Sequence, residues 1–304
     1  MVHVSPSYIN EDQIRAVLSY PELIPAIRHA LMDLSAGQVL HPLRSVIRVA
    51  AHEGWFALMP AVYGKVMGAK MVTFYPGNAT AGKHTHLATI QLFRSDTGEP
   101  LCVMDGRLIT EMRTAAVSAV AVDLLAHPDA SVLSILGSGV QARSHFNALQ
   151  GIRPFRDIRV WSRTPDNAAK FASEIGARTT TAEEAVSGAD VILTLTSSPT
   201  PILHGRWLKL DALVCAVGAV TPDRRELDDE AMQGAVIVES REAALHEPGD
   251  ILHSKAQISA EIGELLSGAR FDRQDRPVIF KSVGVAIEDI AAAKLVYDKL
   301  AKEH

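Results

Sequence analysis

The chain has 304 residues, of which 47% are hydrophobic and 21% are charged, proportions typical of a globular protein with room for two domains. Its formal net charge of −5 provides no basic surface, so nucleic acid is not expected as a partner. No apolar run is long enough to span a membrane and no secretory signal precedes the first helix, which predicts a cytoplasmic protein with Cys102 and Cys215 as buried free thiols.

The first third of the chain combines helices with consecutive strands. Apolar residues recur at helical spacing after the potential cap Asn10 and again over 21–36. Strands without intervening helices follow, which indicates a mostly antiparallel or mixed sheet. Their expected bounds are 45–49, 55–59, 68–75, 87–93 and 101–104, and Asp96-Thr97-Gly98 forms a hairpin turn between the last two.

An alanine- and valine-rich helix over 109–125 leads into a region where strands and helices alternate. This alternation predicts a parallel sheet with helices on both faces. The expected strands are 132–136, 158–162, 190–195, 213–217 and 236–239, and the expected helices are 140–150, 165–175, 182–187 and 227–232.

The tail changes pattern again, with an amphipathic helix at 258–266, a strand at 278–283 and a long helix at 287–300. We expect the last helix to pack on the N-terminal region. The fold class is therefore α/β, with a Rossmann-type parallel sheet domain over 113–283 and a discontinuous α+β domain formed by 1–112 and 284–304.

The segment around Gly137 predicts a dinucleotide site. The apolar run 132–136 ends at Gly137-Ser138-Gly139, and a helix begins at Val140. Gly137 permits a tight turn, Gly139 lets the backbone approach a pyrophosphate, and the small Ala142 allows helix–strand contact. Free N–H groups at the helix start would bind the phosphates. Two glycines in such a turn are weak evidence on their own.

The end of the second strand of this domain favours NADP(H). Rossmann domains that prefer NAD place a carboxylate there to bind the ribose diol. This chain has Ser162-Arg163-Thr164 instead. The Arg163 guanidinium would pair with a 2′-phosphate, which a carboxylate would repel. The cofactor is thus expected to be NADPH, with NADH as the weaker alternative. A solvated helix-start residue is the other interpretation of Arg163.

Three basic residues stand in apolar or strand-like contexts of the first region, namely Arg44, Lys70 and Arg113. Burial would lower the pKa of Lys70 toward a range useful for acid–base chemistry. The two arginines could bind a carboxylate in bidentate fashion. Each residue taken singly is equally compatible with a surface or edge-strand charge. Together with a dinucleotide fold, they suggest a small anionic substrate.

Other polar clusters receive structural interpretations. His84 and His86 have no nearby Asp, Glu or Cys to complete a metal site, so a polar rim or a loop facing the cofactor is favoured. Asp228-Asp229-Glu230 and Glu288-Asp289 are interpreted as charges at helix N-termini, which interact favourably with the helix dipole.

Five motifs of the chain are MDGRLITEMRTAAVSAVA, ILGSGVQARSH, KMVTFY, AVGAVTPDRRELDDE and FKSVGVAIED. They resemble the ornithine cyclodeaminase/mu-crystallin family, and within it the chain is most similar to the ketimine reductase members. The resemblance extends from about residue 42 to about residue 299.

The resemblance implies a homodimer whose discontinuous domain binds substrate and mediates dimerisation, and hydride exchange between a nicotinamide and an amino-acid Cα. It places Arg44, Lys70, Arg113 and His86 in the substrate site, with Lys70 and Arg113 catalytic. The implied cofactor contacts are Thr85, Arg113, Gly137, Ser138, Gly139, Val140, Gln141, Ser162, Arg163, Thr164, Asn167, Thr196, Ser197, Val220, Lys281 and Ser282.

One departure from the family pattern bears on the reaction. Cyclodeaminases have an aspartate where this chain has Val220, and they tend to have an acidic residue at the end of the second strand. Valine cannot take a proton. The resemblance with these departures implies net reduction by NADPH rather than redox-neutral cyclisation.

The leading hypothesis is therefore an NADPH-dependent reductase of small cyclic ketimine carboxylates, such as Δ1-pyrroline-2-carboxylate or Δ1-piperideine-2-carboxylate, yielding L-proline or L-pipecolate. An ornithine cyclodeaminase or an alanine-type amino-acid dehydrogenase is the first alternative. A non-catalytic protein that binds NADPH or a small ligand is the other.

Overall fold

The computed structural model describes residues 6–302 and divides into two compact units. Unit 1 comprises Met1–Arg113 and Val285–His304, and unit 2 comprises Thr114–Gly284. Helix α3 (Arg107–Leu125) belongs to both, because the boundary falls after Arg113. Among residues 6–302, no helix is both long enough and apolar enough to cross a membrane.

Unit 1 contains a seven-stranded sheet in the order β1-β7-β6-β5-β4-β2, with β3 also paired to β4. All pairings are antiparallel except that of β1 with β7. This agrees with the mixed sheet expected from consecutive strands; β1 and β2 were not expected. The strands are β1 (Ser7–Ile9), β2 (Val39–Leu40), β3 (Ser45–Val49), β4 (Gly54–Tyr63), β5 (Val66–Phe74), β6 (His86–Arg94) and β7 (Pro100–Asp105).

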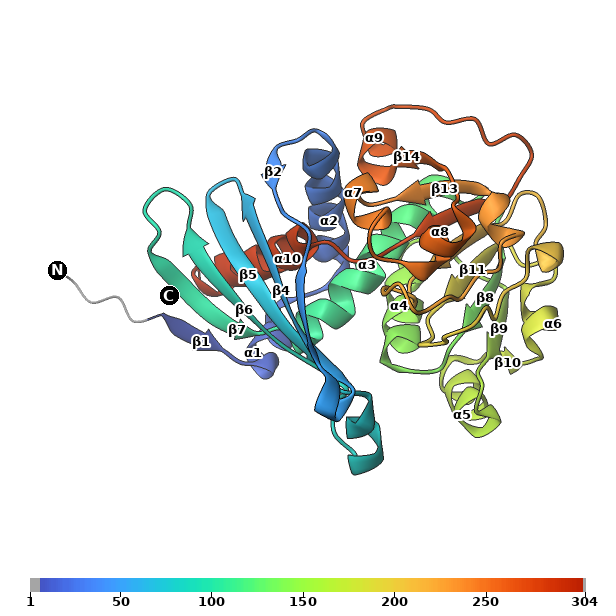
Figure 1. Ribbon diagram of the computed structural model, residues 1–304, viewed down its shortest axis with the longest axis horizontal. Coiled ribbons are helices and arrows are strands. Elements are labelled where there is room, and N and C mark those ends of the chain that lie inside the picture. The colour runs from blue at the N-terminus through green and yellow to red at the C-terminus, as the bar shows by residue number, and fades with distance from the viewer. Residues whose placement is uncertain (1–5, 303–304) are drawn as a thin grey trace. The chain divides into compact units, whose positions relative to one another are not determined.

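Helix α10 (Ala286–Leu300) returns to this sheet and packs on α2 and on β4, β5 and β6, as Figure 1 shows in red against blue and cyan. The sequence predicted this return, and unit 1 is formed by Met1–Arg113 and Val285–His304. Asn10 caps α1 in a capping box with Gln13, also as expected. The other helices of unit 1 are α1 (Glu11–Val17), α2 (Tyr20–Ser35), η1 (Ala50–His52) and η2 (Pro76–Ala81).

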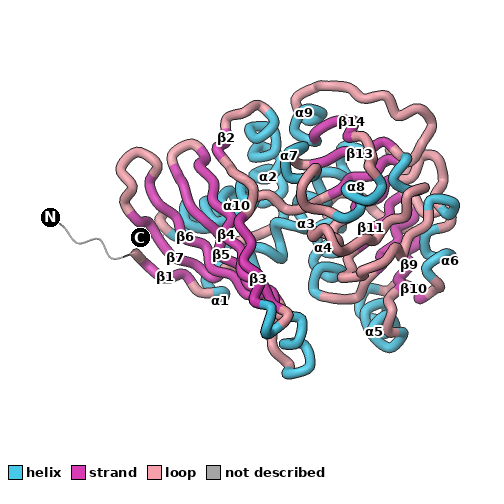
Figure 2. The backbone as a smooth tube through the Cα atoms, in the orientation of Figure 1, coloured by secondary structure: helices cyan, strands magenta, loops and turns pink. Residues whose placement is uncertain are grey.

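Unit 2 contains an eight-stranded, wholly parallel sheet in the order β10-β9-β8-β11-β12-β15-β13-β14. The order reverses between β8 and β11, as in Rossmann domains. Figure 2 shows these strands in magenta with helices around them. The strands are β8 (Val132–Leu136), β9 (Asp157–Trp161), β10 (Arg178–Thr179), β11 (Val191–Thr194), β12 (Leu213–Ala216), β13 (Ala235–Val238), β14 (Ile258–Glu261) and β15 (Val278–Lys281).

Two predicted elements of unit 2 were wrong. The helix expected at 258–266 begins as strand β14 and becomes helical only at Ile262, because Ile258–Glu261 pairs with β13. The helix expected at 227–232 is reduced to the short η4, where the Asp228 side chain accepts the N–H of Ala231. The helices are α4 (Val140–Gln150), α5 (Pro165–Ile175), α6 (Ala182–Val186), α7 (Arg241–Ala244), α8 (Gly249–Ser254), α9 (Ile262–Leu266), η3 (Gly205–Trp207) and η4 (Ala231–Gln233).

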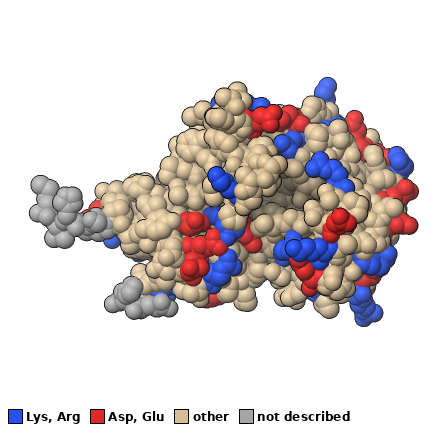
Figure 3. Space-filling model, turned by 90° about the horizontal axis from the view of Figure 1, so that it is seen from below, with Lys and Arg blue, Asp and Glu red and all other residues tan. Residues whose placement is uncertain are grey.

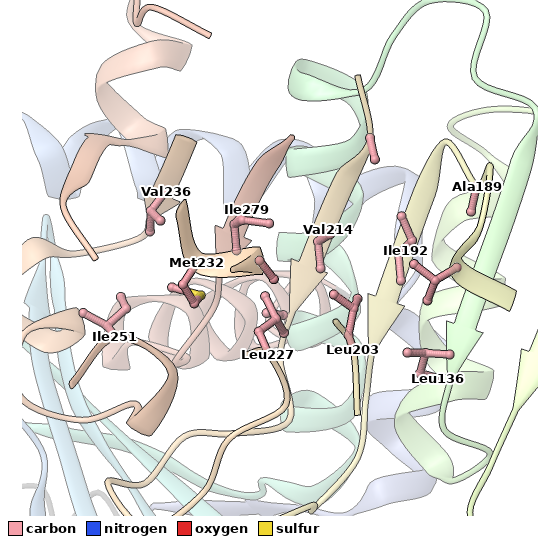
Figure 4. Packing of buried hydrophobic residues seen from close by; sticks show 14 of the residues in the cluster. Leu136, Ala189, Ile192, Leu203, Val214, Leu227, Met232, Val236, Ile251 and Ile279 are labelled. Carbon is pink, nitrogen blue, oxygen red and sulfur yellow. The ribbon is translucent and has the colours of Figure 1, made fainter. Parts of the chain in front are cut away.

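Aliphatic side chains from the central strands of unit 2 form one continuous buried cluster, shown in Figure 4. Leu136, Ile192, Val214, Ile279 and Val236 contribute one layer, each from a different strand. Both faces of a parallel sheet are covered, which explains why these strands are almost wholly apolar. Cys102 and Cys215 are buried free thiols, as predicted.

Candidate active site

Lys70 occupies an inward-facing position of a sheet whose inner face is otherwise apolar. Along β5 the buried residues alternate, and Lys70 takes its place between Gly68 and Val72 on the face that α10 covers. Its side chain is only 2% exposed. The interpretation of Lys70 as a surface or edge-strand charge is therefore wrong.

The Lys70 ammonium is balanced by a carboxylate from the far end of the chain. Lys70 Nζ lies 2.6 Å from Asp289 Oδ2. The other oxygen, Asp289 Oδ1, accepts a hydrogen bond of 2.9 Å from Arg113 Nε. Arg113 Nη1 donates to Glu288 Oε2 at 2.5 Å. Asp289 thus bridges the two basic residues that the sequence singled out.

Glu288 and Asp289 lie at a helix start, as the sequence predicted, but they also pair with the buried basic residues. Both side chains are fully buried in the first turn of α10. Burial alone would raise the pKa of Asp289, but Arg113 and Lys70 outweigh it and hold that pKa below its ordinary value. Asp289 is therefore ionised at neutral pH.

For the pKa of Lys70, burial prevails over the attraction of the neighbouring carboxylate. Burial, assisted by the positive charge of Arg113, lowers the pKa of Lys70 to about 8, although Asp289 acts against the shift. A lysine with this pKa carries a proton at neutral pH and can release it. Lys70 is therefore suited to act as a general acid.

Arg44 belongs to the same row of the sheet as Lys70. It immediately precedes β3, whose first residue Ser45 pairs with Leu58, so Arg44 continues the register toward Met59. Met59 pairs in turn with Lys70. Residues in one row point to one face of a sheet. The positive charge of Arg44 contributes to the lowered pKa of Lys70, which is consistent with their proximity.

Thr85 and His86 lie away from this cluster within unit 1. His86 is the first residue of β6, whereas the β6 partner of Lys70 is Ile90. Four residues of strand correspond to about 13 Å. The exposed His86 ring packs against Phe74 in a tilted arrangement, with 4.5 Å between ring centroids. A contact of Thr85 or His86 with substrate or cofactor stays a prediction.

The glycine turn of unit 2 has the geometry of a phosphate-binding loop. Gly137 has φ +132°, and a Cβ there would lie 2.7 Å from the carbonyl oxygen of Leu195. Gly139 is the N-cap of α4, with open space where its Cβ would be and no side chain capping the helix. Val140 and Gln141 begin the helix, so its first N–H groups suit a pyrophosphate.

The end of β9 lies beside this turn. The Ser138 hydroxyl donates to that of Ser162 at 2.9 Å, which connects the turn to the second strand. Arg163 and Thr164 follow and are exposed, and Thr164 is the N-cap of α5. Asn167 is exposed in the first turn of that helix. The arrangement places an exposed guanidinium where a ribose 2′-phosphate would be recognised.

Thr196 and Ser197 follow the carboxyl end of β11, and Val220 follows that of β12. Lys281 and Ser282 are at the end of β15, but their side chains face the interior of unit 2. Lys281 lies 3.0 Å from Asp250, and the Ser282 hydroxyl donates to Glu239 at 2.5 Å. A cofactor contact from Lys281 or Ser282 stays a prediction and would use the main chain.

Several buried acids were not singled out as partners of site residues from the sequence. They are Glu288 and Asp289 in unit 1, and Glu226, Glu239 and Asp250 in unit 2. Within residues 6–302, no group of three or more His, Cys, Asp or Glu side chains is placed to hold a metal ion.

Comparison with known proteins shows which family the chain is similar to. The model of the ornithine cyclodeaminase/mu-crystallin family matches residues 9–304. Ketimine reductase mu-crystallin of Mus musculus is 46% identical over 304 residues, covering 97% of each chain.

Two solved structures are also similar over nearly the whole chain. Thermococcus litoralis Δ1-pyrroline-2-carboxylate reductase, in complex with NADH and L-proline, superposes with a TM-score of 0.92 at 33% identity, covering 98% of each chain. An archaeal alanine dehydrogenase dimer with bound NAD gives a TM-score of 0.93 at 29% identity, covering 98% of this chain and 97% of that one.

Proposed function

Because the chain belongs to the ornithine cyclodeaminase/mu-crystallin family, we propose that it is an NAD(P)H-dependent reductase of cyclic ketimine carboxylates. Its substrates would be Δ1-pyrroline-2-carboxylate and Δ1-piperideine-2-carboxylate, and its products L-proline and L-pipecolate. The similarity to proteins named ketimine reductase and Δ1-pyrroline-2-carboxylate reductase supports this reaction.

The observation that carries the proposal is the cluster of basic residues around Lys70. Lys70 and Arg113 are buried and share Asp289, and the charge of Arg44 acts on Lys70. Arginine binds a carboxylate in bidentate fashion, so a substrate with one carboxylate suits this cluster.

In the proposed reaction, each basic residue has a distinct task. Arg44 and Arg113 would bind the substrate carboxylate, which reduces the entropic cost of reaching a reactive pose. Lys70 would donate its proton to the imine nitrogen, directly or through water. A bound nicotinamide would supply hydride to the imine carbon. Val220 stands where cyclodeaminases have an aspartate, so this chain has no carboxylate there to activate an amine or water.

We further propose NADPH as the preferred cofactor, with NADH used less well. The support is Arg163, an exposed guanidinium at the end of β9 where NAD-preferring Rossmann domains have a carboxylate.

We also propose that the protein is a homodimer and is located in the cytoplasm. The dimer is suggested by the alanine dehydrogenase dimer, which is similar to this chain.

The test is NADPH oxidation with a panel of five- and six-membered ketimine carboxylates, repeated with NADH. Turnover of either ring, reduced about 100-fold or more in Lys70→Ala, is expected. Pyruvate with ammonia tests for an alanine dehydrogenase, and ammonia release from ornithine without added NADPH tests for a cyclodeaminase. NADPH binding without turnover of any imine would contradict the proposal and favour a binding protein.

Cofactor preference has its own test. In wild-type protein kcat/KM should be higher with NADPH than with NADH. Arg163→Ala should lower the NADPH value about tenfold and leave the NADH value nearly unchanged, because only the 2′-phosphate contact is removed. An equal loss with both cofactors would remove this role from Arg163.

A further inference from the structure

Glu226 is a fully buried carboxylate to which the reaction proposed above assigns no task. Its four acceptor contacts come from two neighbouring strand ends. Oε1 accepts from the N–H and the hydroxyl of Thr196, at 2.6 and 2.7 Å. Oε2 accepts from the N–H of Gly218 at 2.7 Å and the hydroxyl of Thr194 at 2.8 Å. One side chain thus fastens the end of β11 to the end of β12.

The packing at this point leaves no room for a side chain at Gly218. A Cβ on Gly218 would lie 1.9 Å from the carbonyl oxygen of Thr196 and 2.6 Å from Glu226 Oε1. The two segments that follow β11 and β12 are therefore in direct contact around the carboxylate. The ladder between the two strands ends where the N–H of Val217 donates to the Thr194 carbonyl at 3.0 Å, and beyond that point Glu226 joins the two segments.

A second buried acid holds Glu226 itself. Asp250 Oδ1 accepts the N–H groups of Glu226 and Leu227, at 2.8 and 3.0 Å. Asp250 Oδ2 lies 3.0 Å from Lys281 Nζ at the end of β15. The support for the β11 and β12 ends thus continues to a third strand. Both oxygens of Glu226 have their hydrogen-bond donors, and a buried carboxylate satisfied in this way fixes the groups around it.

The sheet order shows which half of a dinucleotide would meet these strand ends. Arg163 and the 2′-phosphate position lie at β9, and the pyrophosphate turn lies at the end of β8. In the order β9-β8-β11-β12, the remaining half of the cofactor must extend toward β11 and β12. That half carries the nicotinamide.

We propose that Glu226 is a positioning residue for the nicotinamide half of the cofactor, acting through the 196–198 and 218–220 segments. The inference rests on the proposed function, since it requires that unit 2 bind a nicotinamide dinucleotide. Because Glu226 is fully buried, it would act without touching the cofactor. It would fix the position of the two segments against which the nicotinamide ring would lie.

Glu226→Gln tests this role with little change in volume. Each carboxylate oxygen accepts one backbone N–H, so a carboxamide in either orientation turns its NH2 toward an N–H that can only donate. One strand end is then released. Fluorescence titration should show the Kd for NADPH raised about tenfold. The Kd for 2′,5′-ADP, which lacks the nicotinamide half, should change less than about twofold, measured by calorimetry.

Asp190→Asn is the matched control at the amino ends of the central strands of the same sheet. Asp190 Oδ2 accepts the N–H groups of Ser131 and Val132, at 2.6 and 2.7 Å, where β8 begins. This variant should lose thermal stability without changing the Kd of either ligand. If Glu226→Gln fails to fold, Thr194→Val removes a single hydrogen bond to Glu226 and should raise the Kd for NADPH about threefold, again without affecting 2′,5′-ADP.

The outcomes are distinguishable. An equal loss of NADPH and 2′,5′-ADP binding in the variants would show a general structural role and overturn the inference. Unchanged NADPH binding would overturn it as well. If wild-type protein binds neither NADPH nor NADH, the proposed function itself fails, whatever the variants do.

Discussion

Asp289 joins two buried cations through its two oxygens, so removing its charge should affect both. In Asp289→Asn, Lys70 and Arg113 would remain buried with less compensation. Breaking a buried ion pair by removing one partner costs about 3–5 kcal/mol. We expect the free energy of unfolding to fall by about 3 kcal/mol in urea denaturation, and kcat/KM to fall at least about tenfold.

Asp298→Asn provides the control on the same helix. Asp298 pairs with Lys294 near the exposed end of α10, and neither side chain is buried. Surface ion pairs of this kind contribute about 0–1 kcal/mol. If Asp289→Asn proved as mild as Asp298→Asn, the bridge between Lys70 and Arg113 would not be needed for stability.

The pKa of Lys70, lowered to about 8, predicts a specific pH dependence of the reaction. The protonated form is the acid, so kcat/KM for a ketimine should be highest below this value and decline as the pH rises through it. Measuring kcat/KM by steady-state kinetics from about pH 5 to about pH 10 would check this. Equal rates across the range, or the same decline in Lys70→Ala, would assign the proton to another group.

Among individual site residues, the sequence predicted the basic ones, such as Lys70, better than their acidic partners. Lys70 attracts notice because a lysine interrupts an apolar strand. Glu288 and Asp289 do not, because acidic residues are common in the first turn of any helix. Only the return of α10 to the sheet brings them to Lys70, and helical periodicity contains no information about that docking.

At the scale of elements, the contact between β5 and α10 is close enough to be tested with one methyl group. A Cβ on Gly68 would lie 2.3 Å from the carbonyl oxygen of Gln91 and 3.0 Å from Ile290 Cδ1 on α10. Overpacking of this kind costs about 1–3 kcal/mol. Gly68→Ala should lower the midpoint of thermal unfolding and also reduce turnover, because Lys70 lies two residues further along β5 and Asp289 is adjacent to Ile290.

Gly77→Ala is the comparison, since a Cβ at Gly77 has no heavy atom within 4 Å and the residue lies in η2. It should leave both stability and turnover close to those of the wild type. A Gly68→Ala variant with normal stability would mean that the helix and the sheet can separate slightly without cost.

Regular elements with clear periodicity were predictable to within a few residues. The bounds of β3, α4 and α5 coincide with the expected ones. Short apolar runs were less predictable, because a strand of four residues and one helical turn have similar patterns. This ambiguity explains the missed β14, and the short β1, β2 and β10 have too few residues for any period.

At the scale of the whole chain, unit 2 is one continuous segment, whereas unit 1 depends on residues that follow unit 2 in the sequence. On the face shown in Figure 3, blue and red side chains are interspersed among larger tan areas. Helix α10 supplies the apolar cover of the unit 1 sheet through buried residues such as Ile287, Ile290 and Val296, along with both site carboxylates. The two units should therefore respond differently to loss of the C-terminal segment.

A chain ending at Gly284 should retain cofactor binding and lose catalysis. The segment 114–284 keeps its whole sheet, so the Kd for NADPH should stay within about threefold of the wild-type value. Unit 1 would expose its apolar sheet face and leave Lys70 and Arg113 without Asp289 and Glu288, which should abolish ketimine turnover and increase binding of a hydrophobic dye.

Adding a synthetic peptide of residues 285–304 to this truncated chain should restore part of the turnover, because the peptide supplies both the apolar cover and the two carboxylates. The same peptide carrying Asp289→Asn keeps the apolar surface but loses the charge that bridges Lys70 and Arg113, so it should cover the sheet without restoring catalysis. Dye binding reports the first effect and NADPH oxidation the second. If both peptides restored turnover equally, apolar packing alone would account for the contribution of α10, and the role of Asp289 in the site would have to be abandoned.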